Sequence, residues 1–466
     1  MTDNRNKRAS GGQPPRARVA LDPARIAAYD VLTAVRAKDS YANLVLPGLL
    51  RERNITGRDA AFATELTSGT LRRQGTYDAI IAVAAGRPLA KIDAAVLDAL
   101  RLGAHQVLST RVAPHAAVTS TVDLVRAKVG HGPAGFSNAV MRRISEQDLA
   151  GWVRRVAPDP VTDPVGFASI AQAHPRWIVS ALTEALGSTG ELDALLAADN
   201  EPPKVTLVAR PGLCAVESLE GTPLPISPYA VELAGGDPGA IKAVRDGRAG
   251  VQDAGSQLVA IALARAPVAG RDDRWLDLCA GPGGKAALLA ALAAESGARV
   301  LAAELQPHRA ALVQSGVRAA VAGIAGVIVA DGTRPAWPAG SFDRVLVDAP
   351  CSGLGALRRR PESRWRRVPA DIESLLPLQR ALLDAALDSV RVGGVVGYAT
   401  CSPVVSETAG VVGGVLAGRS DVRLEAAEPL LPWVTNAASA ALPGAVQLWP
   451  HRHGTDAMFF ALLRKI

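Results

Sequence analysis

The spacing of apolar residues changes character along this chain. From about residue 21 to 149, apolar residues recur at helical spacing, as in segments 25–35 and 94–103. This pattern predicts an all-helical domain over residues 21–150. Pro158, Pro160 and Pro164 then mark a domain edge. Short apolar runs such as 204–209, set among many prolines, predict a small α+β unit over residues 165–248.

From residue 249 onward, apolar runs of strand length alternate with helical segments. Near-continuous apolar runs are typical of buried parallel strands. The pattern therefore predicts a doubly wound α/β domain over residues 249–466. A closing apolar run at 457–463 predicts one more strand, antiparallel and at the sheet edge. The expected parallel strands are 275–279, 299–304, 327–331, 342–348 and 395–400.

Composition limits the class of protein without naming it. The 466 residues are 48% hydrophobic and carry a net charge of +7, which favours an anionic partner. No apolar run approaches a membrane span or a signal peptide, so a cytoplasmic protein is expected. Residues 1–20 predict a disordered basic tail, with positive charges at Arg5, Lys7, Arg8, Arg16 and Arg18.

The four cysteines are not arranged for metal binding. They stand at positions 214, 279, 351 and 401, without a Cys-x-x-Cys pair or a histidine at zinc spacing. No metal site is expected, and the thiols should be free in a reducing compartment. Cys214 lies outside any motif and is expected to pack as a small apolar residue.

Cys351 and Cys401 stand in similar surroundings. Cys351 lies in Asp-Ala-Pro-Cys-Ser-Gly-Leu-Gly and Cys401 in Tyr-Ala-Thr-Cys-Ser-Pro, each just after a predicted strand. The carboxyl ends of parallel strands are where open α/β sheets collect ligands and catalytic groups. Two thiols at one sheet edge suggest covalent chemistry.

The first strand-to-helix turn of this domain is rich in glycine. Residues 277–285 read Asp-Leu-Cys-Ala-Gly-Pro-Gly-Gly-Lys, a turn that lets backbone amides approach a ligand. Glu304 ends the second strand, where a carboxylate can accept from ribose hydroxyls, and Asp331 could bond an adenine amino group. These features leave NAD and S-adenosylmethionine both open as cofactors.

Three motifs in order carry a resemblance to a known family. The glycine turn, the Cys351 motif and the Cys401 motif together resemble those of the Nop/Sun family of RNA cytosine-5 methyltransferases. The likeness extends to segments 251–259 and 453–460, although Glu304 and Ala457 replace the commoner Asp and Gly. The helical region, including segment 137–144, resembles the NusB-like domain of the bacterial Sun-type branch of that family.

The resemblance implies roles for individual residues. Cys401 would be the nucleophile that adds to carbon 6 of cytosine, and Cys351 would assist release. Asp348 would hydrogen-bond the base, while Lys285 would lower a thiol pKa or orient Asp348. Glu407 either orients the Cys401 loop or caps the following helix. The S-adenosylmethionine site is expected to comprise Cys279, Ala280, Gly281, Pro282, Gly283, Gly284, Lys285, Glu304, Arg309, Asp331 and Asp348.

An arginine-rich segment follows Cys351 and predicts a contact with RNA. Arginines can neutralise phosphates and an indole can stack on a base. The alternative is a solvated surface loop. His453, near a turn, is expected to be structural. The predicted RNA-binding residues are Arg358, Arg359, Arg360, Arg364 and Trp365.

Taken together, these observations predict a monomeric methyltransferase that uses S-adenosylmethionine to modify carbon 5 of a cytosine in RNA. The resemblance favours 16S ribosomal RNA as substrate, with transfer RNA as the alternative, and makes the helical domain an RNA-recruiting module. Two other classes stay open: a noncatalytic NusB-like RNA-binding factor and an NAD-dependent oxidoreductase. The paired cysteines argue against both.

Overall fold

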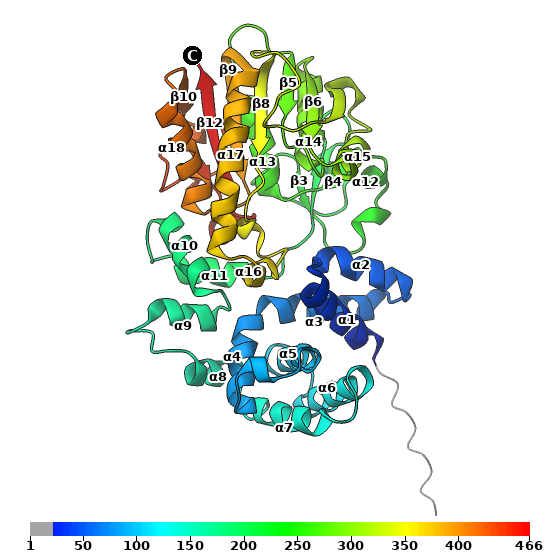
Figure 1. Ribbon diagram of the computed structural model, residues 1–466. Helices are drawn as coiled ribbons and strands as arrows, with labels where there is room; N and C mark the ends of the chain where they lie inside the picture. Colours follow the sequence, from blue (N-terminus) through cyan, green and yellow to red (C-terminus); the bar gives the residue numbers. More distant parts are fainter. Residues whose placement is uncertain (1–21) are drawn as a thin grey trace, which may run out of the picture.

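The computed structural model describes residues 22–466, and the predicted basic tail lies outside them. A helical amino-terminal part lies below a large sheet domain, and further helices run along one side between the two (Figure 1). None of the described helices is long and apolar enough to cross a membrane.

The amino-terminal part is all-helical, as predicted. Aspartates at N-caps accept from the first backbone amides of α1 and α5. Helix α5 is buried on several sides because Ala99 and Leu102 pack with α1–α3, whereas Val96 and Leu100 pack with α4 and α7. Its helices are α1 Pro23–Lys38, α2 Ala42–Glu52, α3 Gly57–Arg72, α4 Gln74–Ala85, α5 Ala94–Ser109, α6 Pro114–Lys128, α7 Ala134–Ile144 and α8 Leu149–Val156.

The segment predicted as one α+β unit divides into two parts. Its first part consists of the helices α9 Pro164–Ala171, α10 Arg176–Leu186 and α11 Leu192–Asp199. Its second part is an antiparallel sheet in the order β2-β3-β1-β4. This sheet contains β1 Thr206–Ala209, β2 Thr222–Pro223, β3 Ala230–Glu232 and β4 Ala249–Val251, with the short helix α12 Lys242–Arg245 before β4.

Strand β4 corrects the expected start of the α/β domain. Residues 249–251 pair with β1 and belong to the small sheet. The α/β domain therefore begins with α13, after this strand rather than at residue 249.

The carboxy-terminal domain is a mixed sheet in the order β10-β12-β9-β8-β5-β6-β7, with β11 paired to β12. Strands β9, β8, β5, β6 and β7 run parallel, as predicted. Its elements are α13 Ala254–Arg265, β5 Arg274–Asp277, α14 Gly284–Glu295, β6 Arg299–Glu304, α15 Pro307–Gly316, β7 Ile324–Val329, β8 Phe342–Asp348, α16 Ser363–Arg366, α17 Pro369–Ser389, β9 Val390–Thr400, α18 Ala409–Gly418, β10 Val422–Glu425, β11 Val446–Gln447, α19 Pro450–His453 and β12 Phe459–Lys465.

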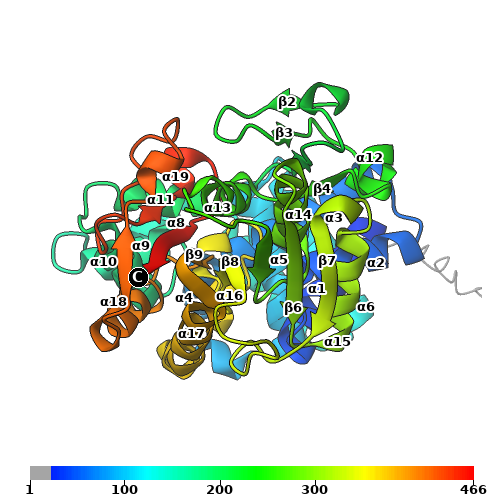
Figure 2. The ribbon, with the colours of Figure 1, turned by 90° about the horizontal axis from the view of Figure 1, so that it is seen from above.

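Alternation along the strands sends side chains to two cores, one on each face of the sheet. Leu346 of β8 packs with α13 and α14, whereas its neighbours Val345 and Val347 pack with α17 and α18. Figure 2 shows these helix pairs on opposite faces of the sheet. The closing strand β12 is antiparallel to β9, as predicted, but β10 lies outside it, so β12 is not the edge strand.

The helical part is joined to the sheet domain by the segment that follows the Cys351 loop. Arg364 is completely buried, and its guanidinium donates to the backbone oxygens of Arg72, Ala173 and Asp199 and to the side chain of Asn200. Arg72 and Asp199 end helices α3 and α11, where backbone carbonyls lack helical partners.

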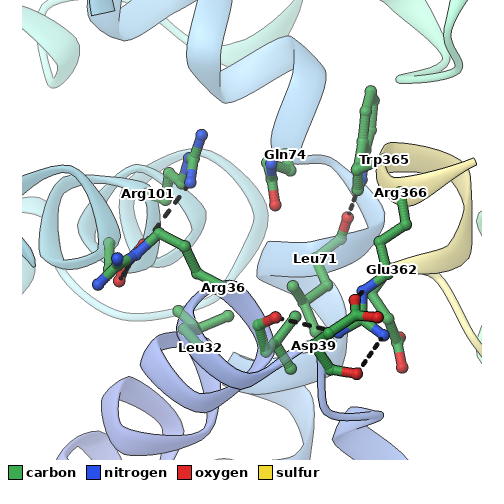
Figure 3. A pocket seen from close by; sticks show the side chains of 11 residues that line it. Leu32, Arg36, Asp39, Leu71, Gln74, Arg101, Glu362, Trp365 and Arg366 are labelled. Atoms are coloured by element: carbon green, nitrogen blue, oxygen red, sulfur yellow. Dashed lines mark hydrogen bonds and ion pairs between the residues drawn. The ribbon is translucent and has the colours of Figure 1, made fainter. Parts of the chain in front are cut away.

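Neighbouring residues extend this joint. The Trp365 indole N–H donates to the Leu71 carbonyl at 2.7 Å, and Arg366 donates to the Val35 carbonyl at 3.0 Å. Figure 3 shows the Trp365 and Arg366 side chains reaching the helical domain beside a pocket of about 180 Å³. Glu362 accepts from the Ala42 backbone N–H at 3.0 Å on the same side. The arginine-rich segment is thus an interdomain joint.

We expect Arg364→Ala to destabilise the full-length protein by about 3 kcal/mol or more, because it leaves several buried carbonyls unsatisfied. Urea unfolding, followed by tryptophan fluorescence, measures the change. Arg360→Ala is the matched control, since Arg360 is exposed and lies over the Tyr41 ring; it should cost less than about 1 kcal/mol. Equal losses in the two variants would contradict the joint.

Candidate active site

The two cysteines of the predicted site lie together at one sheet edge. Strands β8 and β9 are parallel neighbours, and Asp348 at the end of β8 is in register with Ala399. The loops that follow therefore leave the sheet side by side. They bring the Cys351 and Cys401 sulfur atoms to 3.5 Å.

The thiols are electrostatically unequal. The hydrogen bond from Cys351 lowers the pKa of Cys401 against the opposing effect of burial, and the positive charge of Lys285 lowers it further. The same hydrogen bond, together with burial, holds the pKa of Cys351 well above its usual range. Cys401 therefore ionises first, with Cys351 as its hydrogen-bond donor.

Lys285 and Asp348 form an ion pair beside the thiols. The Lys285 Nζ atom lies 2.8 Å from Asp348 Oδ2. Burial alone would lower the pKa of Lys285, but the charge of Asp348 raises it above its ordinary value, so the ammonium group stays charged. Lys285 was expected either to lower a thiol pKa or to orient Asp348. Its position allows both roles, because the cation contacts Asp348 and favours the Cys401 thiolate.

The glycine turn is closed by Glu304 and Arg309. The Gly281 N–H donates to Glu304 Oε2 at 3.0 Å, and Arg309 donates to the Gly281 carbonyl at 2.6 Å. A Cβ atom at Gly281 would lie 2.1 Å from the Glu304 carboxylate, and Gly283 has a φ of +116°. Both positions therefore require glycine. Cys279, Ala280 and Pro282 lie in the turn between β5 and α14, and Gly284 is the first residue of α14.

Asp277 belongs to this site although sequence reasoning did not single it out. It is completely buried, and among residues 22–466 neither carboxylate oxygen has a hydrogen-bond partner. Burial, together with the charge of Asp348, raises its pKa to about 7. An unpartnered buried carboxylate fits a cationic ligand group. The signal in the sequence is its place as the acid that ends a strand just before the glycine turn.

These features fit S-adenosylmethionine, which carries an ammonium and a sulfonium group. Asp277 offers an unused acceptor for a cation, and the glycine turn leaves no room for a side chain at Gly281. Asp331 lies beyond the end of β7, and hydrogen bonds from Thr333 lower the pKa of its carboxyl, which stays ionised. It remains a predicted contact of the adenine amino group.

The other two cysteines lie outside the paired site. Burial raises the pKa of the Cys279 thiol well above its usual range, so it stays neutral. Cys214 packs in the core of the small sheet. Within the part of the chain that the structure describes, no group of three or more His, Cys, Asp or Glu side chains is placed to hold a metal ion.

The predicted RNA-binding arginines are mostly engaged within the protein, which corrects that expectation. Arg358 and Arg359 contact Asp456, and Arg359 also donates to Asp253 at 2.8 Å. Arg364 and Trp365 are held in the interdomain joint. Only Arg360 of the five predicted residues is exposed. The physical reason is that buried acids and helix-end carbonyls in segments distant along the chain supply the partners.

His453 has a structural role, as expected. Its ring accepts from the Trp449 backbone N–H at 2.9 Å, and the second ring nitrogen lies 3.0 Å from the Thr435 carbonyl. These contacts hold the turn that precedes Asp456.

Comparisons with known proteins agree with this geometry. The model of the family described as 16S rRNA methyltransferase RsmB/F matches residues 263–464, and that of the NusB family matches residues 22–146. A protein of Mycobacterium tuberculosis, whose name assigns it to the methyltransferases without a substrate, is 54% identical over 96% of this chain and 97% of its own length.

Two further relatives carry a fuller name, and one solved structure covers nearly the whole chain. The ribosomal RNA small subunit methyltransferases B of Pseudomonas putida and Pseudomonas syringae are 32% and 31% identical, each over 95% of this chain and 98% and 97% of their own lengths. The crystal structure of PH0851 shares the fold, with a TM-score of 0.75 and 21% identity over 96% of this chain and 100% of that one.

The matches to both parts of the chain and the full-length relatives lead to one conclusion. The chain belongs to the 16S rRNA methyltransferase RsmB/F family, with a NusB-family domain at its amino-terminal side and S-adenosylmethionine as its cofactor.

Proposed function

We propose that this enzyme methylates carbon 5 of a cytosine in 16S ribosomal RNA through a covalent adduct with Cys401. The observation that carries the proposal is the pair of unequal thiols 3.5 Å apart, next to the Asp348–Lys285 ion pair. The names of the full-length relatives support small-subunit ribosomal RNA as the substrate.

Carbon 5 of cytosine is a poor nucleophile, which explains the need for a thiolate. The Cys401 sulfur adds to carbon 6, and the electrons of the 5,6 double bond move to carbon 5. Carbon 5 would then bond the methyl carbon as the bond from that carbon to the sulfonium sulfur breaks, leaving a neutral thioether. The hydrogen bond from Cys351 and the nearby Lys285 charge lower the pKa of Cys401 and so favour its thiolate. In our proposal Asp348, at the same edge, hydrogen-bonds the base as charge develops on it.

Release requires that carbon 5 pass its proton to solvent water and that the bond between carbon 6 and sulfur break. The electrons from the C–H bond restore the 5,6 double bond, and the sulfur leaves as the Cys401 thiolate. Cys351 is the group in contact with that sulfur, and its raised pKa keeps it protonated as a donor. It therefore stabilises the departing thiolate.

The cofactor supplies an electrophilic methyl group when bound. In our proposal Asp277 accepts from its ammonium group, Glu304 accepts from its ribose hydroxyls, and Asp331 bonds its adenine. Glu304 already accepts from Gly281 and Gln306, so its carboxylate is held in a fixed orientation. The residues thus hold opposite ends of one elongated cationic molecule.

The substrate and the base are tested together by bisulfite sequencing of ribosomal and transfer RNA from cells with and without the gene. One cytosine of 16S ribosomal RNA should lose protection in cells that lack it. A gene carrying Cys401→Ala should fail to restore protection, with methylation reduced at least about 1000-fold in vitro, while cofactor binding persists. Unreduced methyl transfer by this variant would exclude Cys401 as the nucleophile, and a lost site in transfer RNA would exclude the ribosomal assignment.

Cys351→Ala should accumulate a protein–RNA adduct that survives denaturation, because release loses its donor. The variant also loses the hydrogen bond that lowers the pKa of Cys401. The acid limb of the pH profile for adduct formation should therefore move to higher pH. Denaturing gels with labelled RNA measure both effects. Normal turnover with no adduct would remove Cys351 from the release step.

Binding of the cofactor should release protons near pH 7. A carboxyl with a pKa of about 7 is roughly half protonated there, and a cation beside it lowers that pKa. Calorimetry in buffers of different ionisation enthalpy measures the release. Asp277→Asn should abolish it and weaken binding about 10- to 100-fold. Asp331→Asn is the control, because its carboxyl is already ionised, and it should weaken binding without changing the proton count. An unchanged proton release in Asp277→Asn would contradict the assignment.

A further inference from the structure

A buried carboxylate lies between the two cysteine loops. Glu407 stands six residues after Cys401, in the turn that precedes α18, and its side chain has no exposed surface. A serine directly follows each cysteine: Ser352 follows Cys351, and Ser402 follows Cys401. Both serines contact Glu407.

Four hydrogen bonds converge on this carboxylate. Its Oε1 atom accepts from the Ser352 backbone N–H at 2.8 Å and from the Gln379 side chain at 3.0 Å. Its Oε2 atom accepts from the Ser352 hydroxyl at 2.5 Å and from the Ser402 hydroxyl at 2.6 Å. One rigid group therefore ties the loop of each cysteine to the other.

The carboxylate is itself anchored to the sheet domain. Gln379, on α17, also donates to the Pro350 carbonyl at 2.9 Å, just before Cys351. The Tyr398 hydroxyl, on β9, donates to the Glu407 backbone carbonyl at 2.8 Å. Both anchors come from regular elements, so the position of Glu407 is set by the sheet and by the helix that covers it.

Capping does not explain these contacts. Among the described residues, α18 has no side-chain cap, and its N-cap position is Thr408. The four hydrogen bonds instead offset the cost of burying a carboxylate away from water. A carboxylate is kept here in contact with both loops that carry the proposed chemistry.

We propose that Glu407 is the positioning residue that sets the separation and orientation of Cys351 and Cys401. The inference rests on the proposed function, since it assigns Glu407 to the geometry of the attack and release steps. Placement matters because reacting groups that are displaced by about 1 Å can lose about 100-fold in rate. The negative charge of Glu407 also contributes to the high pKa of Cys351, which favours the protonated donor.

Glu407→Gln is the principal test, because it keeps the shape of the side chain and replaces one acceptor oxygen by a donor group. With the amide NH2 in the place of Oε2, the Ser352 and Ser402 hydroxyls must accept instead of donate, so the two short bonds to a charged oxygen are replaced by weaker neutral ones. We expect kcat to fall about 100-fold, while KM values for RNA and for S-adenosylmethionine change less than about threefold. Fluorescence-detected cofactor binding and thermal melting report whether the fold persists.

Single serine variants test the contribution of each loop. RNA that contains 5-fluorocytosine traps the adduct, because carbon 5 then carries fluorine in place of the proton that release must remove. Ser402→Ala should slow the formation of this adduct about 10-fold. Ser352→Ala should leave its formation nearly unchanged and should raise the amount of adduct that natural RNA accumulates during turnover.

Asp343→Asn is the matched control. Asp343 is a fully buried carboxylate at the opposite end of β8, bonded to Arg271, Arg391 and two backbone amides. It should lower thermal stability without changing the rates of adduct formation or release. The positioning role would be overturned if Glu407→Gln and both serine variants lost thermal stability, as this control does, but kept wild-type rates of adduct formation and release.

The outcomes distinguish this inference from the proposed function. Methyl transfer that persists in Cys401→Ala, with no trapped adduct in the wild type, would defeat the covalent mechanism itself. A wild-type adduct that depends on Cys401, together with wild-type kcat in Glu407→Gln, would defeat only the role of Glu407. Should Glu407→Gln fail to fold, the serine variants decide the question through the same adduct rates.

Discussion

The parallel pairing of β8 with β9 is the constraint on which the active site depends. The register places Asp348 opposite Ala399, so the two chains leave the sheet at the same level and in the same direction. Two loops from neighbouring parallel strands then have few ways to diverge within two or three residues. The contact between Cys351 and Cys401, and the Glu407 carboxylate that ties their loops, follow from this one pairing.

The helical domain reaches this edge through the chain segment that follows Cys351. Residues 351–367 begin at the Cys351 loop and end in the interdomain joint, where Arg367 turns back to donate to the Ser352 carbonyl at 3.2 Å. Helices α10 and α11 pack against Leu354 and Val404, which lie in the two cysteine loops. The part of the protein that matches the NusB family is thus connected to the loops of both thiols by packed side chains and hydrogen bonds.

Much of this architecture could be predicted from the sequence because it depends on local patterns. The apolar runs gave five parallel strands, and the glycine turn and paired cysteines gave the functional edge. The arginine-rich segment was predicted to contact RNA because a run of charges usually lies in solvent, but four of its five predicted residues are engaged within the protein. Its partners are helix-end carbonyls at Leu71, Arg72 and Asp199, and these sites exist only once distant helices meet. For Glu407 the sequence indicated a role in the Cys401 loop or as a helix cap, but not its contact with the Cys351 loop, since Ser352 and Gln379 are far from it along the chain.

Charge balance links the cofactor site to the thiols. The site holds three acids, Asp277, Glu304 and Asp348, against two bases, Lys285 and Arg309. The charges of Asp348 and Glu304 both help to raise the pKa of Asp277. The site without a ligand therefore holds more acid than it can keep ionised. A cation bound beside Asp277 corrects this imbalance and adds positive charge near a lysine that already favours the Cys401 thiolate. Under the proposed function, the positive charges of the bound cofactor and of Lys285 would both favour the Cys401 thiolate, so cofactor binding and thiolate formation would support each other.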